Sequence, residues 1–138
     1  IYTAPIPTVA VINGIAAGAG FALSLACDFR VSTESGKFTT AFSKVGFSGD
    51  FGITYFLSKI VGLSKAKELL FFSDIINASE AYELGIINYL IDSKNKEKFT
   101  NEMKNKIKSL PPIAIKYMKK KLLFVLQKCN IIYKNYNF

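Results

Sequence analysis

Residues 7–28 read PTVAVINGIAAGAGFALSLACD, and this stretch decides the fold class. Its first part, residues 8–12, is rich in β-branched side chains and ends at Asn13-Gly14, which predicts a short buried strand. The segment 15–20 is too rich in glycine for a regular element. Residues 21–26 are apolar on every side, which predicts a short buried helix. A strand, a tight glycine turn and a buried helix in this order indicate an α/β fold.

The rest of the chain continues this alternation of strands and helices. The capping-box spacing of Asn77 and Glu80 predicts the start of a helix over residues 77–84, with Gly85 as the residue after its end. Ser64 is the expected N-cap of a helix over residues 64–72. Further strands are expected at 29–32, 37–39 and 86–91, a glycine-rich loop at 43–52, and lysine-rich helices at 94–109 and 112–128, separated by Pro111-Pro112.

The net charge of +8 is unevenly distributed along the chain. Residues 1–92 hold 6 basic and 8 acidic side chains, a net of −2, whereas residues 93–138 hold 12 lysines and two glutamates, a net of +10. A basic end favours an anionic partner: nucleic acid, an acidic membrane surface or a phosphate-bearing ligand. A solvated lysine-rich helix is the alternative that needs no partner.

Histidine is absent from the sequence. Its absence excludes Ser-His-Asp and Cys-His catalysis and the usual histidine-containing zinc sites. The two cysteines, Cys27 and Cys129, form no CxxC pair, so we expect neither a metal site nor a disulfide framework. A reducing location, the cytoplasm or an organelle matrix, fits this cysteine usage.

Residues 6–27 carry no charge over 22 positions, which is long enough to cross a bilayer. Pro7 at the start of this run, Asn13 in its middle and four small residues at 16–19 argue against a membrane span. No basic segment precedes the run, as a signal peptide would require. We therefore expect no association with a membrane.

The glycine cluster is a candidate anion site. A glycine-rich turn between a strand and a helix directs several backbone N–H groups at one point, which suits an anion or an oxyanion. The dinucleotide motif GxGxxG would need glycine where Leu23 stands, and the P-loop would need Gly-Lys-Ser/Thr. The alternative is that these small residues only allow close packing of helix and strand.

Several motifs together resemble the enoyl-CoA hydratase/isomerase (crotonase) family, whose pattern kPviAavnG-A-GgG-eLalacD is similar to residues 7–28. The similarity covers residues 5–122 in consistent order. It continues through Lys37-Phe38, Phe42-Ser43-Lys44-Val45-Gly46, Tyr55-Phe56-Leu57, Val61-Gly62, Ala66, Glu68-Leu69-Leu70, Ala78-Ser79-Glu80-Ala81, Leu84-Gly85 and Leu110-Pro111-Pro112.

The resemblance implies a crotonase-like (ClpP/crotonase) α/β fold, a spiral of ββα turns followed by helices that mediate trimer formation. Residues 1–92 would be the C-terminal half of the spiral core, and residues 93–138 the helical trimerisation region of a homotrimer or dimer of trimers. A full family member is about twice as long, and its N-terminal part supplies a second oxyanion N–H. Lys116, Lys119 and Lys120 are candidates for meeting the CoA phosphates, and the tail 123–138 departs from the family's final helices.

For the site, the resemblance implies an acyl-CoA thioester substrate whose enolate oxygen is held by the backbone N–H of Ala19. The neighbouring Gly18 and Gly20 would also contact substrate, as would Ala22, Phe42 and Phe47. The family's hydratases carry two glutamates that activate water, and this sequence has Ala22 and Phe42 in their place. Neither side chain transfers a proton, so water addition by the usual pair is not expected. Coenzyme A is part of the substrate, and no separate cofactor, metal or nucleic acid is expected.

Asp50 stands where the isomerase-type members carry the carboxylate that moves a proton between acyl carbons. The interpretation requires a buried carboxylate, and Phe47 and Phe51 are expected to desolvate it, which raises its pKa and makes it a stronger base. An aspartate in a glycine-rich loop also suits a purely turn-forming role. Ser48-Gly49 and Ile53 depart from the family pattern in this loop. The predicted activity is a double-bond shift in an enoyl-CoA; a hydratase and a non-catalytic assembly module are the alternatives.

Overall fold

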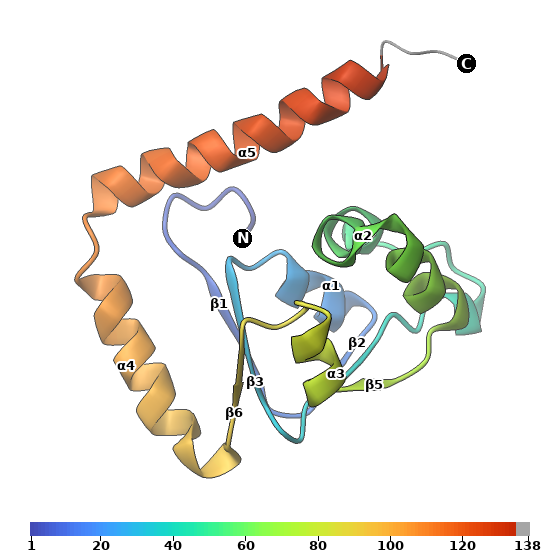
Figure 1. The fold of residues 1–138 in the computed structure, drawn as a ribbon, viewed down its shortest axis with the longest axis horizontal. Coiled ribbons are helices and arrows are strands. Elements are labelled where there is room, and N and C mark those ends of the chain that lie inside the picture. Colours follow the sequence, from blue (N-terminus) through green and yellow to red (C-terminus); the bar gives the residue numbers. More distant parts are fainter. Residues whose placement is uncertain (135–138) are drawn as a thin grey trace.

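The computed structural model describes the backbone of residues 1–134 and the side chains of residues 1–124. The chain forms a body of strands and helices, and its last two helices lie outside this body, the first along one side and the second across the adjoining side (Figure 1). In chain order the elements are β1 (Val9–Ile12), β2 (Ile15–Ala17), α1 (Ala19–Leu25), β3 (Phe29–Thr33), β4 (Lys37–Thr39), the 3-10 helix η1 (Ser43–Val45), α2 (Ile53–Phe72), β5 (Ile76–Asn77), α3 (Ala78–Glu83), β6 (Tyr89–Ile91), the 3-10 helix η2 (Ser93–Asn95), α4 (Lys96–Lys108) and α5 (Pro112–Lys134).

The strands form two small sheets. In one, the order is β1-β3-β6 and all strands are parallel; in the other, the order is β2-β4-β5, with β2 parallel and β5 antiparallel to β4. Each ββα unit thus contributes one strand to each sheet. The first expected strand is confirmed as β1, although Val11 is 42% exposed and the strand is only half buried.

The expectation of irregular structure over residues 15–20 is wrong. Ile15–Ala17 forms β2, which pairs with β4 in register from Ile15 opposite Lys37 to Ala17 opposite Thr39. The helix α1 begins directly afterwards, at Ala19, inside the glycine cluster. Only Gly18 lies outside a regular element here, because its φ of +49° turns the chain between strand and helix.

The helix α2 includes, as its second part, the helix expected over residues 64–72. It runs from Ile53 to Phe72 and contains a kink at Gly62, where φ is 77° and ψ is 163°. Ile53 and Leu57 are fully buried in its first part and join the hydrophobic core. The non-helical Gly62 separates this first part, for which the sequence predicted no helix, from the second part, which agrees with the expected helix.

The core lies between α1, α2, α3 and the second sheet. Its largest fully buried apolar side chains are Phe21, Phe38, Ile53, Leu57 and Ile86.

The predicted start of the helix at Asn77 is confirmed in one of the two bonds of a capping box. The Asn77 side chain accepts a hydrogen bond from the Glu80 N–H at 2.9 Å, and Gly85 follows the helix with φ +71°.

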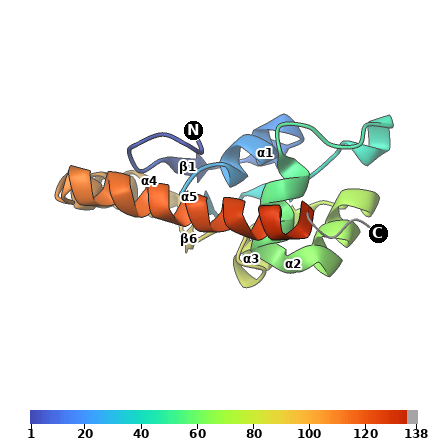
Figure 2. The same cartoon turned by 90° about the horizontal axis from the view of Figure 1, so that it is seen from above.

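The C-terminal helices extend beyond this body. Seen from above, α5 lies across one side of the molecule, next to the N-terminal segment (Figure 2). It reaches Lys134, six residues further than expected, and α4 lies within the range expected for it. Within the part that the structure describes, no helix combines the length and apolar character needed to cross a membrane.

Candidate active site

The glycine turn is the N-terminal end of α1. Gly18 is the N-cap residue, and its own N–H donates to the Thr39 carbonyl at 3.1 Å, which ties the turn to β4. Ala19 and Gly20 are the first two residues of the helix. The N–H groups of a first helical turn have no acceptor within the helix, so these amides are available to an anion.

The phenylalanine at position 42 lies beside this turn. A Cβ atom placed on Gly18 would be 3.8 Å from the tip of the Phe42 ring and 3.8 Å from the Thr40 carbonyl oxygen. Ala22, the other residue that replaces a hydratase glutamate, is fully buried and packs in the core. Its side chain therefore fills core space in this chain, and its contact with substrate stays a prediction.

Asp50 lies on an exposed loop between η1 and α2. Its carboxylate accepts a hydrogen bond from the Phe51 N–H at 2.8 Å, and its carbonyl accepts one from the Ile53 N–H at 3.1 Å. Gly49 and Phe51 have φ values of 99° and 54°. Asp50 thus has the turn-forming role that its residue type favours in such a loop.

The expected burial of the Asp50 carboxylate is wrong for this chain. Asp50 is exposed, and so are the two aromatic residues that were expected to desolvate it, Phe47 at 70% and Phe51 at 57%. The loop is nevertheless connected to the glycine turn. The helix α2 begins three residues after Asp50 and packs against α1, the helix that follows the turn. No hydrogen bond between Asp50 and residues 18–20 occurs among the described residues.

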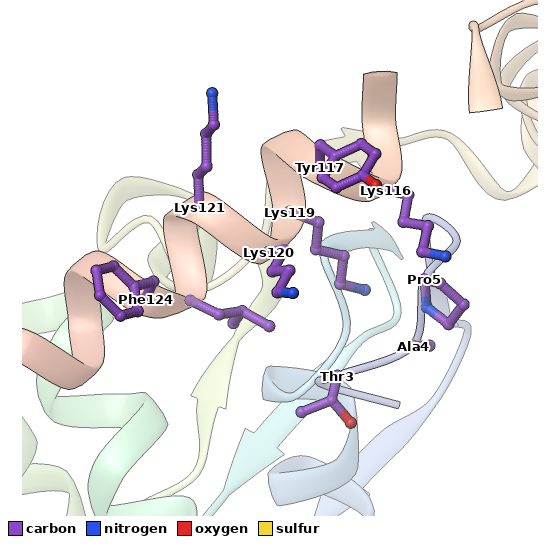
Figure 3. Close-up of a pocket in the computed structure, with 10 residues that line it drawn as sticks. Thr3, Ala4, Pro5, Lys116, Tyr117, Lys119, Lys120, Lys121 and Phe124 are labelled. Atoms are coloured by element: carbon purple, nitrogen blue, oxygen red, sulfur yellow. The ribbon is translucent and has the colours of Figure 1, made fainter. Parts of the chain in front are cut away.

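A groove of about 800 Å³ separates α5 from the N-terminal segment. Its walls are mainly the basic and aromatic side chains of α5 and the chain at residues 3–5 (Figure 3). Lys116 and Lys120 point toward the N-terminal segment, whereas Lys121 points away from it. The groove thus combines apolar walls with ammonium groups.

Lys119 has a different role from the one suggested for it. Its side chain is buried, and its Nζ lies 2.6 Å from an Asp28 carboxylate oxygen and 3.1 Å from the Ile6 carbonyl oxygen. The same Asp28 oxygen accepts hydrogen bonds from the N–H and the hydroxyl of Thr8 at 2.7 and 2.8 Å. The ammonium is neutralised inside the protein, so of the three lysines only Lys116 and Lys120 remain candidates for binding phosphate.

Cys27 provides a direct test of this part of the structure. Burial raises the pKa of its thiol, and the thiolate is the reactive form. We therefore expect iodoacetamide to alkylate Cys27 several-fold more slowly at pH 8 than a cysteine in an unfolded peptide. Peptide mass mapping gives the rate for Cys27 apart from Cys129, whose side chain lies outside the described residues; a rate equal to that of the unfolded peptide would contradict the described burial.

Two supports of the site were missed from the sequence. One is the Asp28–Lys119 pair, and the other is a cluster of hydroxyl groups at Thr40, Ser43 and Ser73. Lys119 is 91 residues from Asp28, and Ser73 is 30 or more residues from Thr40 and Ser43, so no local pattern indicates that they meet. Among the described residues, no group of three or more His, Cys, Asp or Glu side chains could hold a metal ion.

The sequence matches known proteins over most of its length. The family model for enoyl-CoA hydratase/isomerase matches residues 1–131. The chain is 34% identical over 113 residues to a short-chain-enoyl-CoA hydratase of Clostridium acetobutylicum, an alignment that covers 82% of this chain and 43% of that protein. It is 34% identical over 116 residues to an enoyl-CoA isomerase/hydratase of Mycosarcoma maydis, covering 83% of this chain and 42% of that protein.

Solved structures of similar fold belong to the same family. A crystal structure of an enoyl-CoA hydratase from Bacillus anthracis superposes with a TM-score of 0.88 at 35% identity, covering 92% of this chain and 49% of that chain. The chain therefore spans about half the length of the proteins it matches. The trimer that the resemblance implies stays a prediction. With a family model that covers nearly the whole sequence and a fold shared with solved hydratases, this chain belongs to the enoyl-CoA hydratase/isomerase (crotonase) family.

Proposed function

We propose that this chain carries part of an acyl-CoA site which, in the complete protein, shifts a double bond in an enoyl-CoA thioester. The observation that carries the proposal is the geometry of the glycine turn. Ala19 is the first residue of α1, so its N–H has no acceptor in the helix, and the apolar Phe42 ring lies beside Gly18. A backbone N–H aimed at a developing negative charge stabilises an enolate without any rearrangement. The side chain of residue 19 plays no part in this, so alanine is acceptable there.

The proton-transfer role goes to Asp50. Its carboxylate removes a proton from the carbon next to the thioester carbonyl, the electrons move onto the carbonyl oxygen at the Ala19 N–H, and the proton returns at another carbon of the conjugated system. The substrate is isomerised, and atoms and charge balance without a cofactor. Because Asp50 is exposed in this chain, the desolvation that would strengthen it as a base must come from the bound thioester or from protein outside these 138 residues.

The acyl-CoA itself would be anchored away from the chemistry. Lys116 and Lys120 face the groove beside α5 and carry the charge that CoA phosphates attract. Lys119, held by Asp28, would not contribute.

Hydration of the double bond is the second candidate. It is favoured by the names of the relatives, most of which are hydratases. Against it stand Ala22 and Phe42, which can neither position nor deprotonate water. A non-catalytic assembly role is the third, and it is favoured by the exposure of Asp50.

Product analysis separates the three candidates. We expect the complete protein, incubated with a 3-enoyl-CoA in deuterated water, to produce the 2-enoyl isomer. Deuterium should enter at the protonated carbon whenever Asp50 exchanges its proton with solvent during turnover. A 2-enoyl-CoA should give little 3-hydroxyacyl-CoA.

Brisk formation of the 3-hydroxy product, read by mass spectrometry, would replace the isomerase proposal with the hydratase. Absence of both products, with acyl-CoA still bound, would favour the assembly role.

A further inference from the structure

We propose that three hydroxyl groups, those of Ser43, Ser73 and Thr40, position the glycine turn and the Phe42 wall for the reaction. We call them the hydroxyl chain. The expected effects on turnover rest on the proposed function. Ser73 is assigned a positioning role, which it performs through the residues it bonds to. The expected structural effects do not depend on activity.

The hydroxyl chain joins the end of α2 to the segment that links β4 and η1, which lies 30 or more residues earlier in the sequence. The Ser73 oxygen lies 2.7 Å from the Thr40 hydroxyl and 2.7 Å from the Ser43 hydroxyl. Thr40 follows β4, Ser43 begins η1, and Ser73 is the C-cap residue of α2. Thr40 and Ser73 are almost completely buried, at 1% and 0% exposure.

The direction of each hydrogen bond follows from counting protons. A hydroxyl has one proton to donate, and Thr40 donates its own to the Leu69 carbonyl at 2.8 Å. The Ser73 proton has two acceptors within reach, the Thr40 oxygen at 2.7 Å and the Leu70 carbonyl at 3.4 Å, and the shorter contact assigns it to Thr40. The bond between Ser73 and Ser43 is then donated by Ser43. The result is an ordered chain from Ser43 through Ser73 and Thr40 to the end of α2, in which each bond polarises the next.

Ser73 adopts a backbone conformation that favours glycine. Its φ is 51°, in the left-handed region, where a side chain is strained. A glycine would take this C-cap position without strain. What serine supplies at this position, and glycine would not, is the hydroxyl that accepts from Ser43 and donates to Thr40.

The same residue also holds the strand that supports the turn. The Ser73 carbonyl accepts a hydrogen bond from the Thr39 hydroxyl at 2.9 Å, and the Thr39 carbonyl accepts the one from the Gly18 N–H. The Thr40 carbonyl accepts the Phe42 N–H at 2.8 Å and lies beside Gly18. Residues 39–43 are thus attached to Ser73 at both ends. They include the Thr40 carbonyl and the Phe42 ring, which are the two groups that flank the glycine turn.

The test uses variants of the complete protein that remove the hydroxyl without adding bulk or strain. Ser73→Gly removes the middle hydroxyl and relieves the left-handed strain, and Thr40→Val removes the last donor of the chain with the same side-chain shape. Thr40→Ser keeps the hydroxyl. Ser79→Ala, on the exposed face of α3, is the matched control because no hydrogen bond involves its side chain in the described structure.

We expect kcat per folded enzyme to fall about tenfold or more in Ser73→Gly and Thr40→Val, with KM changed less than about twofold, because small misplacements of reacting groups act mainly on the chemical step. Thr40→Ser and Ser79→Ala should stay near the wild-type kcat. Amide hydrogen exchange should become faster at residues 18–20 and 43–52 in the first two variants only.

A merely structural hydroxyl chain would lower the melting temperature of Ser73→Gly and Thr40→Val and leave kcat per folded enzyme unchanged, and this outcome would overturn the proposal. So would wild-type exchange at residues 18–20 and 43–52. A wild-type protein without enoyl-CoA turnover would instead refute the proposed function, and the exchange measurement alone would then decide whether Ser73 orders the turn.

Discussion

Replacing Asp50 with asparagine is expected to lower the turnover of an enoyl-CoA by about 10²–10⁴-fold, with little change in KM, because a positioned general base contributes this much to a proton transfer. The substitution is well matched to the structure. The asparagine side-chain oxygen can still accept the Phe51 N–H, as the Asp50 carboxylate does at 2.8 Å, so the loop keeps its local hydrogen bond. Only the ability to take up a proton is lost.

Asp74→Asn is the control for this experiment. Asp74 is also exposed, lies at the end of α2 and makes no hydrogen bond or ion pair among the described contacts. Steady-state kinetics of both variants in the complete protein should separate a specific loss from a general effect of removing a carboxylate. Turnover by Asp50→Asn within about twofold of wild type would remove Asp50 from the mechanism and leave it as a loop former.

Replacing Asp28 with alanine is expected to destabilise the protein by about 2–4 kcal/mol. The carboxylate oxygen accepts from the Thr8 N–H, the Thr8 hydroxyl and the Lys119 ammonium, and alanine leaves all three donors without this acceptor. An ammonium that loses its partner inside a protein carries a large desolvation penalty. The side chain of Asp28 is 28% exposed, so water screens part of the interaction and the loss stays below that of a fully buried pair.

The measurement is chemical denaturation of the single and double variants. Lys119→Met removes the charge but keeps the length of the side chain, and it should cost about 1 kcal/mol. Because the double variant has no unpaired ammonium, it should be more stable than Asp28→Ala alone. Lys65→Met is the control: it breaks the exposed pair with Glu68, which is 2.8 Å long, and should cost less than about 0.5 kcal/mol. An Asp28→Ala variant as stable as Lys65→Met would contradict this account.

The local features of the fold could be predicted because each depends on a few adjacent residues. The β-branched run that forms β1, the Asn77 cap and the left-handed Gly85 follow from backbone preferences over one or two turns. Pro112 begins α5 as expected, because its missing N–H has no role in the first helical turn. The position of the glycine turn, between a strand and a buried helix, is of the same kind.

Features that depend on pairing could not be predicted in this way. Ile15–Ala17 is a strand because β4 lies next to it, and its own composition suggested a loop. The first part of α2, before the non-helical Gly62, buries Ile53 and Leu57 against the core, and this packing supports a helical segment that no local pattern indicated.

The sequence by itself therefore determined the family, the position of the glycine turn and the identity of Asp50 as the carboxylate in the following loop. Only the tertiary structure decided that Asp50 is exposed, that Lys119 is bound by Asp28, and that Ser73 joins three segments beside the turn. The physical reason is the separation along the sequence between the residues that interact. Turns and caps are set by neighbouring residues, whereas burial and ion pairing depend on side chains from distant parts of the chain, 91 residues apart for Asp28 and Lys119.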